Sequence, residues 1–418
     1  MRVAIRLISV AILVILLAPM LVACGEDGAT QSPTSTAGLV VPATSSPVAE
    51  FTLADPGSGA TRTPETSMAG TPGALSSSPQ QLMQHELLQY QPNEAGRVPV
   101  FMYHNIVGED APFDSSVGEY MYRTRTQFWN DMLFLYENNF YLTPMSDVVH
   151  GTIDIPAGKH PVVFTFDDST SLHLTLVQNE QGEWVPDEDC AVGMMESFYR
   201  QYPDFGRGAY FATVPGNGFS WPAMEQDDLV TEKVEWLISN NYEIGNHTML
   251  HPDLSAISAD EFRENVGFPI LWLDRQVGAD NPMNAMRILT LPFGIYPEPE
   301  VAPENYELMI KGFYYEDVWY EVDGVLLLNG GSTWSYYSQA WDAYRITRVP
   351  VDDSVFPAMA TGIETGESYY YTSDGNPNTV TVPKPATQPD WAQVDADRVT
   401  ASGKTLVTYD PETGEILP

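Results

Sequence analysis

The stretch VVFTFDDST, at residues 162–170, decides the fold class of this chain. Its first five residues are apolar or β-branched, a run typical of a strand buried on both faces of a parallel sheet. The run ends on two adjacent carboxylates, Asp167 and Asp168. Two like charges side by side raise each other's pKa unless a positive partner lies near them. Alone, the doublet indicates no more than a turn, because Asp commonly begins one.

Strand-like and helix-like segments alternate on both sides of this stretch. Amphipathic patterns predict helices at residues 126–139 and 228–241, and SADE at residues 258–261 matches a capping box that opens another helix. Short apolar runs predict strands at residues 98–104, 140–142, 208–214, 242–248, 286–294, 324–331 and 344–351. Roughly six or seven strand–helix units predict an α/β fold, either a (β/α) barrel or a doubly wound sheet.

Polar side chains follow three of the predicted strands: His104 follows VPVFMY, Asp167 follows VVFTF and His247 follows YEIGN. In both architectures the C-terminal ends of the strands meet at one edge, where catalytic residues gather. His247 and His251 are four residues apart in HTMLH, a spacing that suits one metal ion on a helix face. Pro252 follows directly, so a loop or a tight turn stays open as the alternative.

The carboxylate doublet and the histidine pair together suit a metal site. A divalent metal accepts two neutral imidazoles and one carboxylate, with open positions for water and substrate. Asp168, His247 and His251 supply that set. Asp167 is then free to accept a proton from a water molecule that the metal activates. The positive charge of the metal also offsets the repulsion within the doublet.

Three motifs stand in order along the chain: TFDD at residues 165–168, HTMLHPDLS at 247–255 and LPFGIY at 291–296, with MYHNI upstream at 102–106. Together they resemble the NodB-homology polysaccharide deacetylases of carbohydrate esterase family 4, and MYHNI resembles the early motif of exported members. The resemblance covers about residues 97–351. It implies a deformed (β/α) barrel that binds a divalent metal, zinc in the first place, with cobalt, manganese or nickel as alternatives.

The resemblance also implies a role for each residue of the motifs. Asp167 takes the position of the catalytic base, and Pro292 and Phe293 take the place of the loop that lines the acetyl pocket. A backbone N–H near Phe293 would help to hold the oxyanion. The metal positions fall on Asp168, His247 and His251.

Two residues of the family pattern are missing. Thr290 replaces the usual Arg that stands two residues before the Pro and pairs with the catalytic Asp. Conceivable substitutes are Arg287, Arg345 and Arg348. The late Leu-x-His that supplies the general acid is also missing, because no His follows His251.

His104 is the candidate replacement for the missing acid, because it ends the first predicted strand and would lie at the catalytic rim. A structural His that bonds a neighbouring loop is the alternative. The remaining histidines are expected in the tether or on the surface: His85, His150, His160 and His173.

The N-terminus predicts export. A basic start and an apolar run at residues 7–20 are typical of a signal peptide, and LVAC at residues 21–24 resembles a lipobox. The resemblance implies removal of residues 1–23 and lipidation of Cys24, which would anchor the protein to the outer face of the cell membrane. A plain signal peptide with a chance Cys is the alternative. Lipidation would leave Cys190 without an intramolecular disulfide partner.

Composition divides the rest of the chain. Residues 24–95 are rich in Ser, Thr and Pro and predict a disordered tether, ahead of a catalytic domain at 96–351. Residues 352–418 predict a partly irregular C-terminal extension with a small hairpin near TLVTYD. Lys and Arg number 19 against 56 Asp and Glu, a net charge of −37 that excludes nucleic acid as a partner. No obligate protein partner is implied, and membrane contact is expected only through Cys24.

The favoured function is metal-dependent deacetylation of a cell-surface or extracellular polysaccharide, with an N-acetylated sugar as substrate. Such an enzyme is a hydrolase of carbon–nitrogen bonds in linear amides. An O-acetyl ester deacetylase of the xylan type is one alternative, and a catalytically weakened, lipid-anchored glycan-binding protein is another. The intact Asp167 favours an enzyme, because a protein that only binds has no use for a base beside the metal.

Overall fold

The computed structural model describes residues 81–112, 118–215, 226–387 and 393–418. The predicted signal peptide, Cys24 and the tether up to residue 80 lie outside the described residues. Within the described ranges, no helix has both the length and the apolar character needed to cross a membrane.

The centre of the structure is a closed ring of seven parallel strands. The ring closes because β2 pairs with β16 on one side and with β6 on the other. Its strands are β2 (Val100–Tyr103), β16 (Ile346–Pro350), β14 (Gly324–Gly330), β11 (Asn284–Thr290), β10 (Glu243–Asn246), β9 (Tyr210–Thr213) and β6 (His160–Phe166). Of the two architectures expected, the structure therefore confirms the (β/α) barrel.

The barrel is deformed at β6, the strand of the opening motif. The first half of β6 pairs with β5 (Phe140–Leu142), which lies outside the ring. Only Thr165 and Phe166, at its end, pair with β9. One strand thus has two different neighbours along the same edge.

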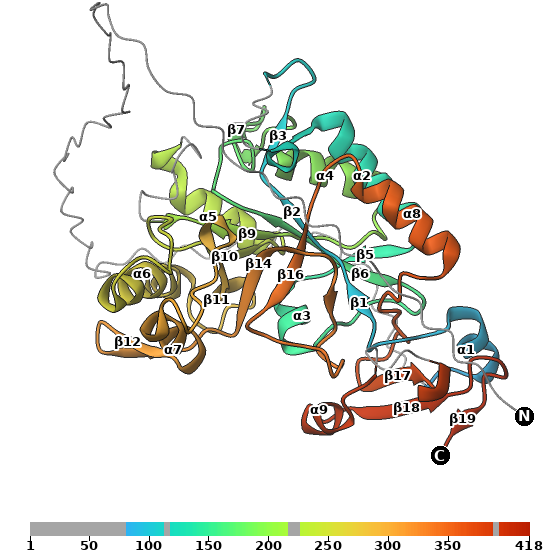
Figure 1. Cartoon of the computed structure of the whole chain (residues 1–418). Coiled ribbons are helices and arrows are strands. Elements are labelled where there is room, and N and C mark those ends of the chain that lie inside the picture. The colour runs from blue at the N-terminus through green and yellow to red at the C-terminus, as the bar shows by residue number, and fades with distance from the viewer. Residues whose placement is uncertain (1–80, 113–117, 216–225, 388–392) are drawn as a thin grey trace, which may run out of the picture. The chain divides into compact units, whose positions relative to one another are not determined.

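Helices pack around the outside of this barrel (Figure 1). They are α2 (Arg125–Glu137), α4 (Ala191–Gln201), α5 (Val230–Ser239), α6 (Ala259–Val277), α7 (Pro303–Lys311) and α8 (Val355–Thr365). The predicted capping box of α6 is confirmed: the Ser258 hydroxyl accepts from the N–H of Glu261, whose carboxylate accepts from the N–H of Ser258. This reciprocal pair sets where α6 begins.

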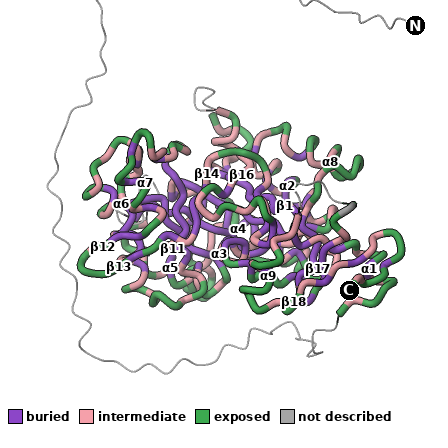
Figure 2. Tube along the Cα trace, turned by 60° about the horizontal axis from the view of Figure 1, so that its bottom comes forward, coloured by how far each residue is buried: buried purple, intermediate pink, exposed green. Residues whose placement is uncertain are grey.

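Side chains alternate between the lumen of the barrel and the surrounding helices, as the two-residue period of a strand requires. On β6, Phe164 and Phe166 belong to the core beneath the helices. Val163 belongs instead to a second cluster inside the barrel, the lumen cluster, which also contains Val100, Tyr210, Ile288 and Ile346. Helix α3 (Met145–His150) packs Val148 and Val149 into that cluster. Figure 2 shows the strands buried and the outer faces of the helices exposed. The lumen is therefore a packed core.

Short elements complete the described residues. Hairpins are formed by β7 (Leu176–Gln178) with β8 (Trp184–Pro186), and by β12 (Phe313–Tyr315) with β13 (Val318–Tyr320). Two further pairs join β1 (Arg97–Val98) to β15 (Thr333–Trp334), and β3 (Asn105–Val107) to β4 (Tyr122–Thr124).

The C-terminal segment forms a three-stranded sheet that pairs with the residues preceding the barrel. Its strands are β17 (Thr379–Pro383), β18 (Thr405–Tyr409) and β19 (Ile416–Leu417), with α9 (Ala396–Ala401) between the first two. The predicted hairpin is confirmed as β18 and β19. Helix α1 (Gln84–Tyr90) lies near this sheet, and Asn93 forms a bridge with Thr372. Residues 84–95, assigned above to the tether, are therefore folded.

A buried carboxylate joins these two segments. Glu94, 3% exposed, accepts hydrogen bonds from the hydroxyl of Tyr371 (2.9 Å) and the N–H of Thr381 (2.8 Å). Burial, followed by the nearby carboxylate of Asp374, raises the pKa of Glu94 from 4.5 to about 8. Glu94 is therefore protonated when the protein is folded at neutral pH.

We expect Glu94→Gln to flatten the pH dependence of stability between about pH 5 and pH 8. In the unfolded chain Glu94 loses its proton near pH 4.5, whereas the native protein keeps it up to about pH 8. The native state binds more protons in this window, so the free energy of unfolding falls as pH rises, by at most about 1.4 kcal/mol per pH unit. Urea unfolding at a series of pH values measures this slope.

The exposed Glu304→Gln is the matched control and should keep the wild-type slope. Equal slopes for wild type and Glu94→Gln would show that Glu94 is not protonated in the native protein.

Candidate active site

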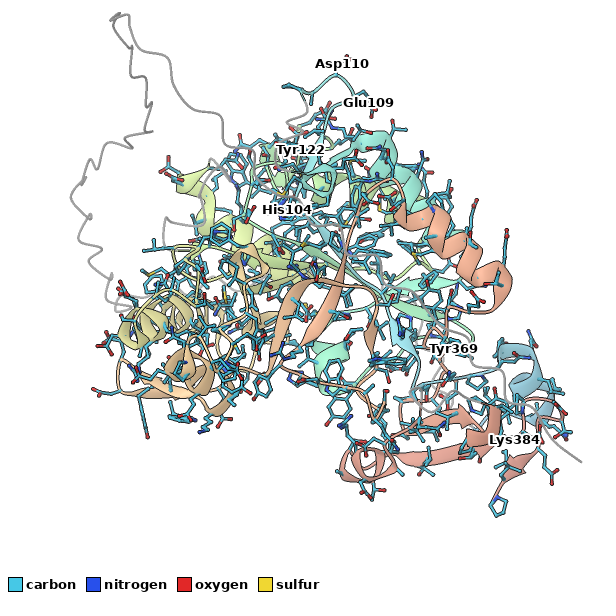
Figure 3. All side chains as sticks on the ribbon, in the orientation of Figure 1. His104, Glu109, Asp110, Tyr122, Tyr369 and Lys384 are labelled. Carbon is cyan, nitrogen blue, oxygen red and sulfur yellow. The ribbon has the colours of Figure 1, made fainter. Side chains whose placement is uncertain are left out.

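The candidate site lies at the C-terminal ends of β2, β6 and β10. The lumen face of β2 leads through Met102 to His104, and that of β6 leads through Thr165 to Asp167. His247 follows directly after β10. Figure 3 places His104 on the same side of the barrel as Tyr122, far from Lys384 of the C-terminal segment.

Asp168, His247 and His251 form a group that could hold a metal ion, with one donor atom from each residue within 4.8 Å of the others. Nε2 of His247 lies 3.3 Å, and Nε2 of His251 3.5 Å, from Oδ1 of Asp168. His247 can donate its Nδ1–H to the carbonyl of Thr290 at 3.0 Å, which leaves a lone pair on Nε2. Nε2 atoms of the two histidines are only 3.2 Å apart. Two converging lone pairs beside a carboxylate fit a bound cation.

The segment HTMLH is a turn rather than a helix, so the loop alternative for the histidine pair is the correct one. Thr248 and His251 have φ angles of 68° and 57°. Asp168 and Phe293, in two other loops of the site, have φ angles of 79° and 57°. This left-handed conformation costs about 1–3 kcal/mol for a non-Gly residue, and such residues cluster at functional sites.

Arg348 on β16 holds Asp167 by a bidentate ion pair. Its two terminal nitrogens donate to Oδ1 and Oδ2 of Asp167, both at 2.8 Å, and one of them also donates to the hydroxyl of Thr165 at 3.0 Å. Arg348 is only 1% exposed. Burial alone would raise the pKa of Asp167, but the charge of Arg348 leads the opposing effects and the pKa is lowered.

Of the three arginines considered for this role, only Arg348 reaches Asp167 in the described structure. Arg287 pairs with Asp274 at 2.9 Å, and Arg345 pairs with Glu298 at 2.6 Å. In HPVVFTFD and YRITRVPV the two-residue period places Asp167 and Arg348 on the lumen face of their strands. That signal separates Arg348 from its neighbour Arg345, which faces the other way.

A tyrosine lies beside the position where the family pattern has its Arg. The Tyr210 hydroxyl donates to the carbonyl of Ile288 at 2.7 Å and lies 3.3 Å from the hydroxyl of Thr290. Its ring crosses Gly245 so closely that a Cβ there would lie 2.0 Å from it. The small residues at 245 and 290 make room for the ring, and sequence reasoning did not single out Tyr210.

His104 lies beside the donor set but is not part of it. Its Nε2 is 4.0 Å from Oδ2 of Asp168, whereas its buried Nδ1 has no hydrogen-bond partner among the described residues. Burial is the main cause that lowers the pKa of His104. The imidazole is therefore held neutral by its surroundings.

The expectation that His173 lies on the surface is wrong. His173 is fully buried, and its Nε2 lies 2.5 Å from the backbone carbonyl of His104. Burial lowers the pKa of His173 to about 4, so Nε2–H donates to that carbonyl from a neutral ring. The flanking leucines of SLHL were the only signal of burial. His150, in contrast, is exposed as expected, and bonds Asp323.

Phe293 lies at the mouth of the site. It belongs to a short 3₁₀ turn, η4 (Pro292–Gly294), and its ring meets that of His251 edge to face at 4.5 Å. The side chain is 61% exposed. In this turn the N–H groups of Gly294 and Ile295 donate to the carbonyls of Leu291 and Pro292, and the N–H of Phe293 takes no part in these two bonds.

The fold of this chain is similar to those of several solved deacetylase structures. No protein-family model matches the chain. It is similar to a polysaccharide deacetylase from Bacillus cereus, with 18% identity over 64% of this chain and 69% of that one, at a TM-score of 0.43. It is also similar to the deacetylase PplD of Streptococcus pyogenes in complex with acetate, with 16% identity over 60% of this chain and 91% of that one, at a TM-score of 0.41. Its identity to IcaB of Ammonifex degensii is 17% over 65% of this chain and 98% of that one, at a TM-score of 0.40.

We expect Arg348→Met to destabilise the protein by about 3–5 kcal/mol, because it leaves the Asp167 carboxylate buried without its partner. Urea unfolding measures the loss. The double variant Asp167→Leu/Arg348→Met should recover most of it, because neither partner of the pair is then left as an unpaired buried charge.

Arg345→Met is the matched control, since it breaks an ion pair that is exposed and contributes about 0–1 kcal/mol. Equal losses in the two single variants would contradict the assignment of Arg348.

Proposed function

We propose that this protein hydrolyses acetyl groups from a cell-surface or extracellular polysaccharide, with an N-acetylated sugar as the first candidate substrate. One observation carries the proposal. Asp167, held by Arg348, lies next in sequence to Asp168, which forms a metal-donor group with His247 and His251. This places a proton acceptor beside a position for a cation, as hydrolysis of an unactivated acyl group requires.

The proposed cofactor is a divalent metal, zinc in the first place, with cobalt, manganese or nickel as alternatives. Asp168, His247 and His251 would hold it. When bound, such an ion polarises the acyl oxygen and lowers the pKa of water. Three protein donors leave positions open, which is typical of a catalytic rather than a structural site.

Asp167 is the proposed general base. Its lowered pKa keeps it ionised at neutral pH. Arg348 donates one hydrogen bond to each carboxylate oxygen, and each oxygen keeps a further lone pair that can accept a proton from the attacking water. The bidentate pair also prevents rotation of the carboxylate.

Phe293 is the proposed acyl-binding residue, together with Pro292. Its exposed ring packs on the His251 side of the site, where an acetyl methyl group would contact it. The backbone N–H of Phe293 would donate to the oxygen that becomes negative as water adds to the carbonyl.

His104 is the proposed hydrogen-bond donor to the leaving group. A protonated imidazole carries a proton on both nitrogens. In His104 the proton on Nδ1 would be buried without an acceptor, which is unfavourable. His104 therefore suits a leaving group that needs little protonation. This observation favours an O-acetyl ester of the xylan type as the second candidate substrate. Glycan binding without turnover is less favoured, because it would have no use for the ion-paired Asp167.

The proposed localisation follows from the N-terminal signals alone: export, removal of residues 1–23, and anchoring through lipidated Cys24 by a tether that ends before α1 at residue 84. The catalytic domain would occupy residues 96–351, followed by the extension at 352–418. No nucleic acid and no obligate protein partner are proposed.

Cys24→Ser should move the protein from the membrane fraction to the soluble fraction of the cells that express it, because it removes the lipidated thiol. Labelling with a radioactive fatty acid should be lost at the same time. Lipid labelling that persists in Cys24→Ser would overturn the anchor.

We expect Asp167→Asn to lower acetate release by about 10²–10⁴-fold, because the amide cannot take a proton from water. Acetate is measured with acetylated chito-oligosaccharides and, separately, with acetyl-xylan, before and after removal of metal by a chelator. Zinc binding should persist in the variant, since Asp168 and both histidines remain. Asp274→Asn, in the half-buried pair with Arg287 outside the site, is the matched control.

His104→Ala in the same assay tests the role of the imidazole. The loss should be no larger on the amide than on the ester, because a neutral His104 donates a hydrogen bond and transfers no proton. A larger loss on the amide would show that His104 acts as a general acid, since an amine leaves poorly without a proton. Failure of wild type to release acetate from either substrate in a metal-dependent way would refute the enzyme, and equal rates for wild type and Asp167→Asn would refute the mechanism.

A further inference from the structure

The loop that carries His247 and His251 has no regular secondary structure, yet each of its backbone N–H groups has an acceptor. His247 donates to the carbonyl of Thr213 in the neighbouring strand at 2.9 Å. Thr248 donates to Oδ1 of Asn246 at 2.8 Å, and His251 donates to the hydroxyl of Thr248 at 2.9 Å. Met249 donates to the backbone carbonyl of Asn265 at 2.8 Å, and Leu250 donates to the side-chain Oδ1 of the same Asn265 at 3.1 Å. One residue of α6, Asn265, thus accepts two of the five bonds.

The carbonyl of Asn265 is available because of a proline inside α6. In a regular helix this carbonyl would accept from the N–H of residue 269. Residue 269 is Pro, which has no N–H, and a Pro ring also crowds the carbonyl four residues before it. The acceptor that the helix leaves unused is the one that Met249 binds.

The side chain of Asn265 is itself held in place. It is 6% exposed, and its Nδ2 donates to the carbonyl of Glu261 one turn earlier, at 2.9 Å. This bond directs Oδ1 toward the N–H of Leu250. Asn246 ties the adjacent carbonyl of α6 to the same loop, because its Nδ2 donates to Val266 at 3.0 Å. Two consecutive carbonyls of α6, those of Asn265 and Val266, therefore accept hydrogen bonds from the loop that carries the two histidines or from Asn246, which precedes it.

The loop needs this support because its backbone is strained. Thr248 is β-branched and has a φ angle of 68°, and His251 has a φ angle of 57°. Such a conformation is unfavourable for a residue other than Gly and persists only where surrounding bonds determine it. The same conformation brings the two Nε2 atoms to 3.2 Å.

We propose that Pro269 and Asn265 form a clamp that sets the geometry of His247 and His251 for metal binding. Both are positioning residues, because the clamp acts on the loop backbone rather than on the donor atoms. The proposal rests on the metal site of the proposed function. It also accounts for a Pro inside a helix, which by itself destabilises the helix.

The test uses the full chain and measures zinc affinity by competition titration and coordination geometry by the visible spectrum of bound cobalt. Pro269→Ala restores an N–H that competes for the Asn265 carbonyl, so zinc should bind about tenfold more weakly. The metal-free variant should be at least as stable to urea as wild type, because a helix-breaking residue is gone. Asn265→Ala should weaken zinc binding by about 10–100-fold.

Amide hydrogen exchange at Met249 supplies a readout that requires no metal. Exchange should become faster in Pro269→Ala, since Met249 then competes with the helix for its acceptor. Pro303→Ala is the matched control, because Pro303 is an exposed first residue of α7, where a restored N–H has no helical acceptor. It should leave zinc affinity, the cobalt spectrum and Met249 exchange unchanged.

Wild-type zinc affinity and wild-type Met249 exchange in Pro269→Ala would overturn the clamp and leave the proposed function intact. If Pro269→Ala both binds zinc more weakly and is less stable to urea than wild type, the weaker binding would follow from the loss of stability. Pro269 would then be a structural residue, and the proposal would be overturned. Failure of wild type to bind zinc or cobalt would overturn the metal site and, with it, the clamp.

Discussion

The ion pair between Arg348 and Asp167 is the interaction on which the rest of the site depends. Both side chains are buried in the lumen of a closed barrel, where an unpaired charge is very unfavourable. A bidentate guanidinium satisfies both oxygens of Asp167 and lowers its pKa. Asp168 is then left to face His247 and His251. The two carboxylates that follow β6 therefore have different partners: Arg348 binds Asp167, and the two histidines lie beside Asp168.

Packing around this pair explains several residues that have no chemical role. Tyr210 lies next to Thr290, and its ring requires glycine at position 245. His173 supports the backbone of His104, while α3 packs into the lumen cluster. Strained φ angles at Asp168, Thr248, His251 and Phe293 collect in the loops after the strands, where the barrel core below can hold them. The packed lumen of the barrel thus lies beneath a rim of irregular loops that carries the strained residues.

Much of the candidate site could be predicted from local sequence, because strand ends and short motifs are local features. His104, Asp167 and His247 each follow an apolar run, and a (β/α) barrel gathers such positions at one rim. The partner of Asp167 could not be chosen in this way. The two-residue period separates Arg348 from Arg345, but it does not decide between Arg348 and Arg287, since contacts across a barrel depend on strand order. The buried His173 was missed because a polar insertion follows it and its neighbours indicate no partner.

By itself, the sequence determined the class of fold, the three residues that could hold a metal ion and the neighbouring carboxylate, since each depends on hydrophobic period, residue type and spacing along the chain. Only the tertiary structure decided that the sheet closes at the β2–β6 pairing, that HTMLH is a turn, and that Arg348 rather than Arg287 or Arg345 reaches Asp167. It also decided that the carbonyl left unused by Pro269 meets Met249. These outcomes depend on contacts between segments that are far apart in sequence, and no local pattern encodes which of several possible partners comes within hydrogen-bonding distance.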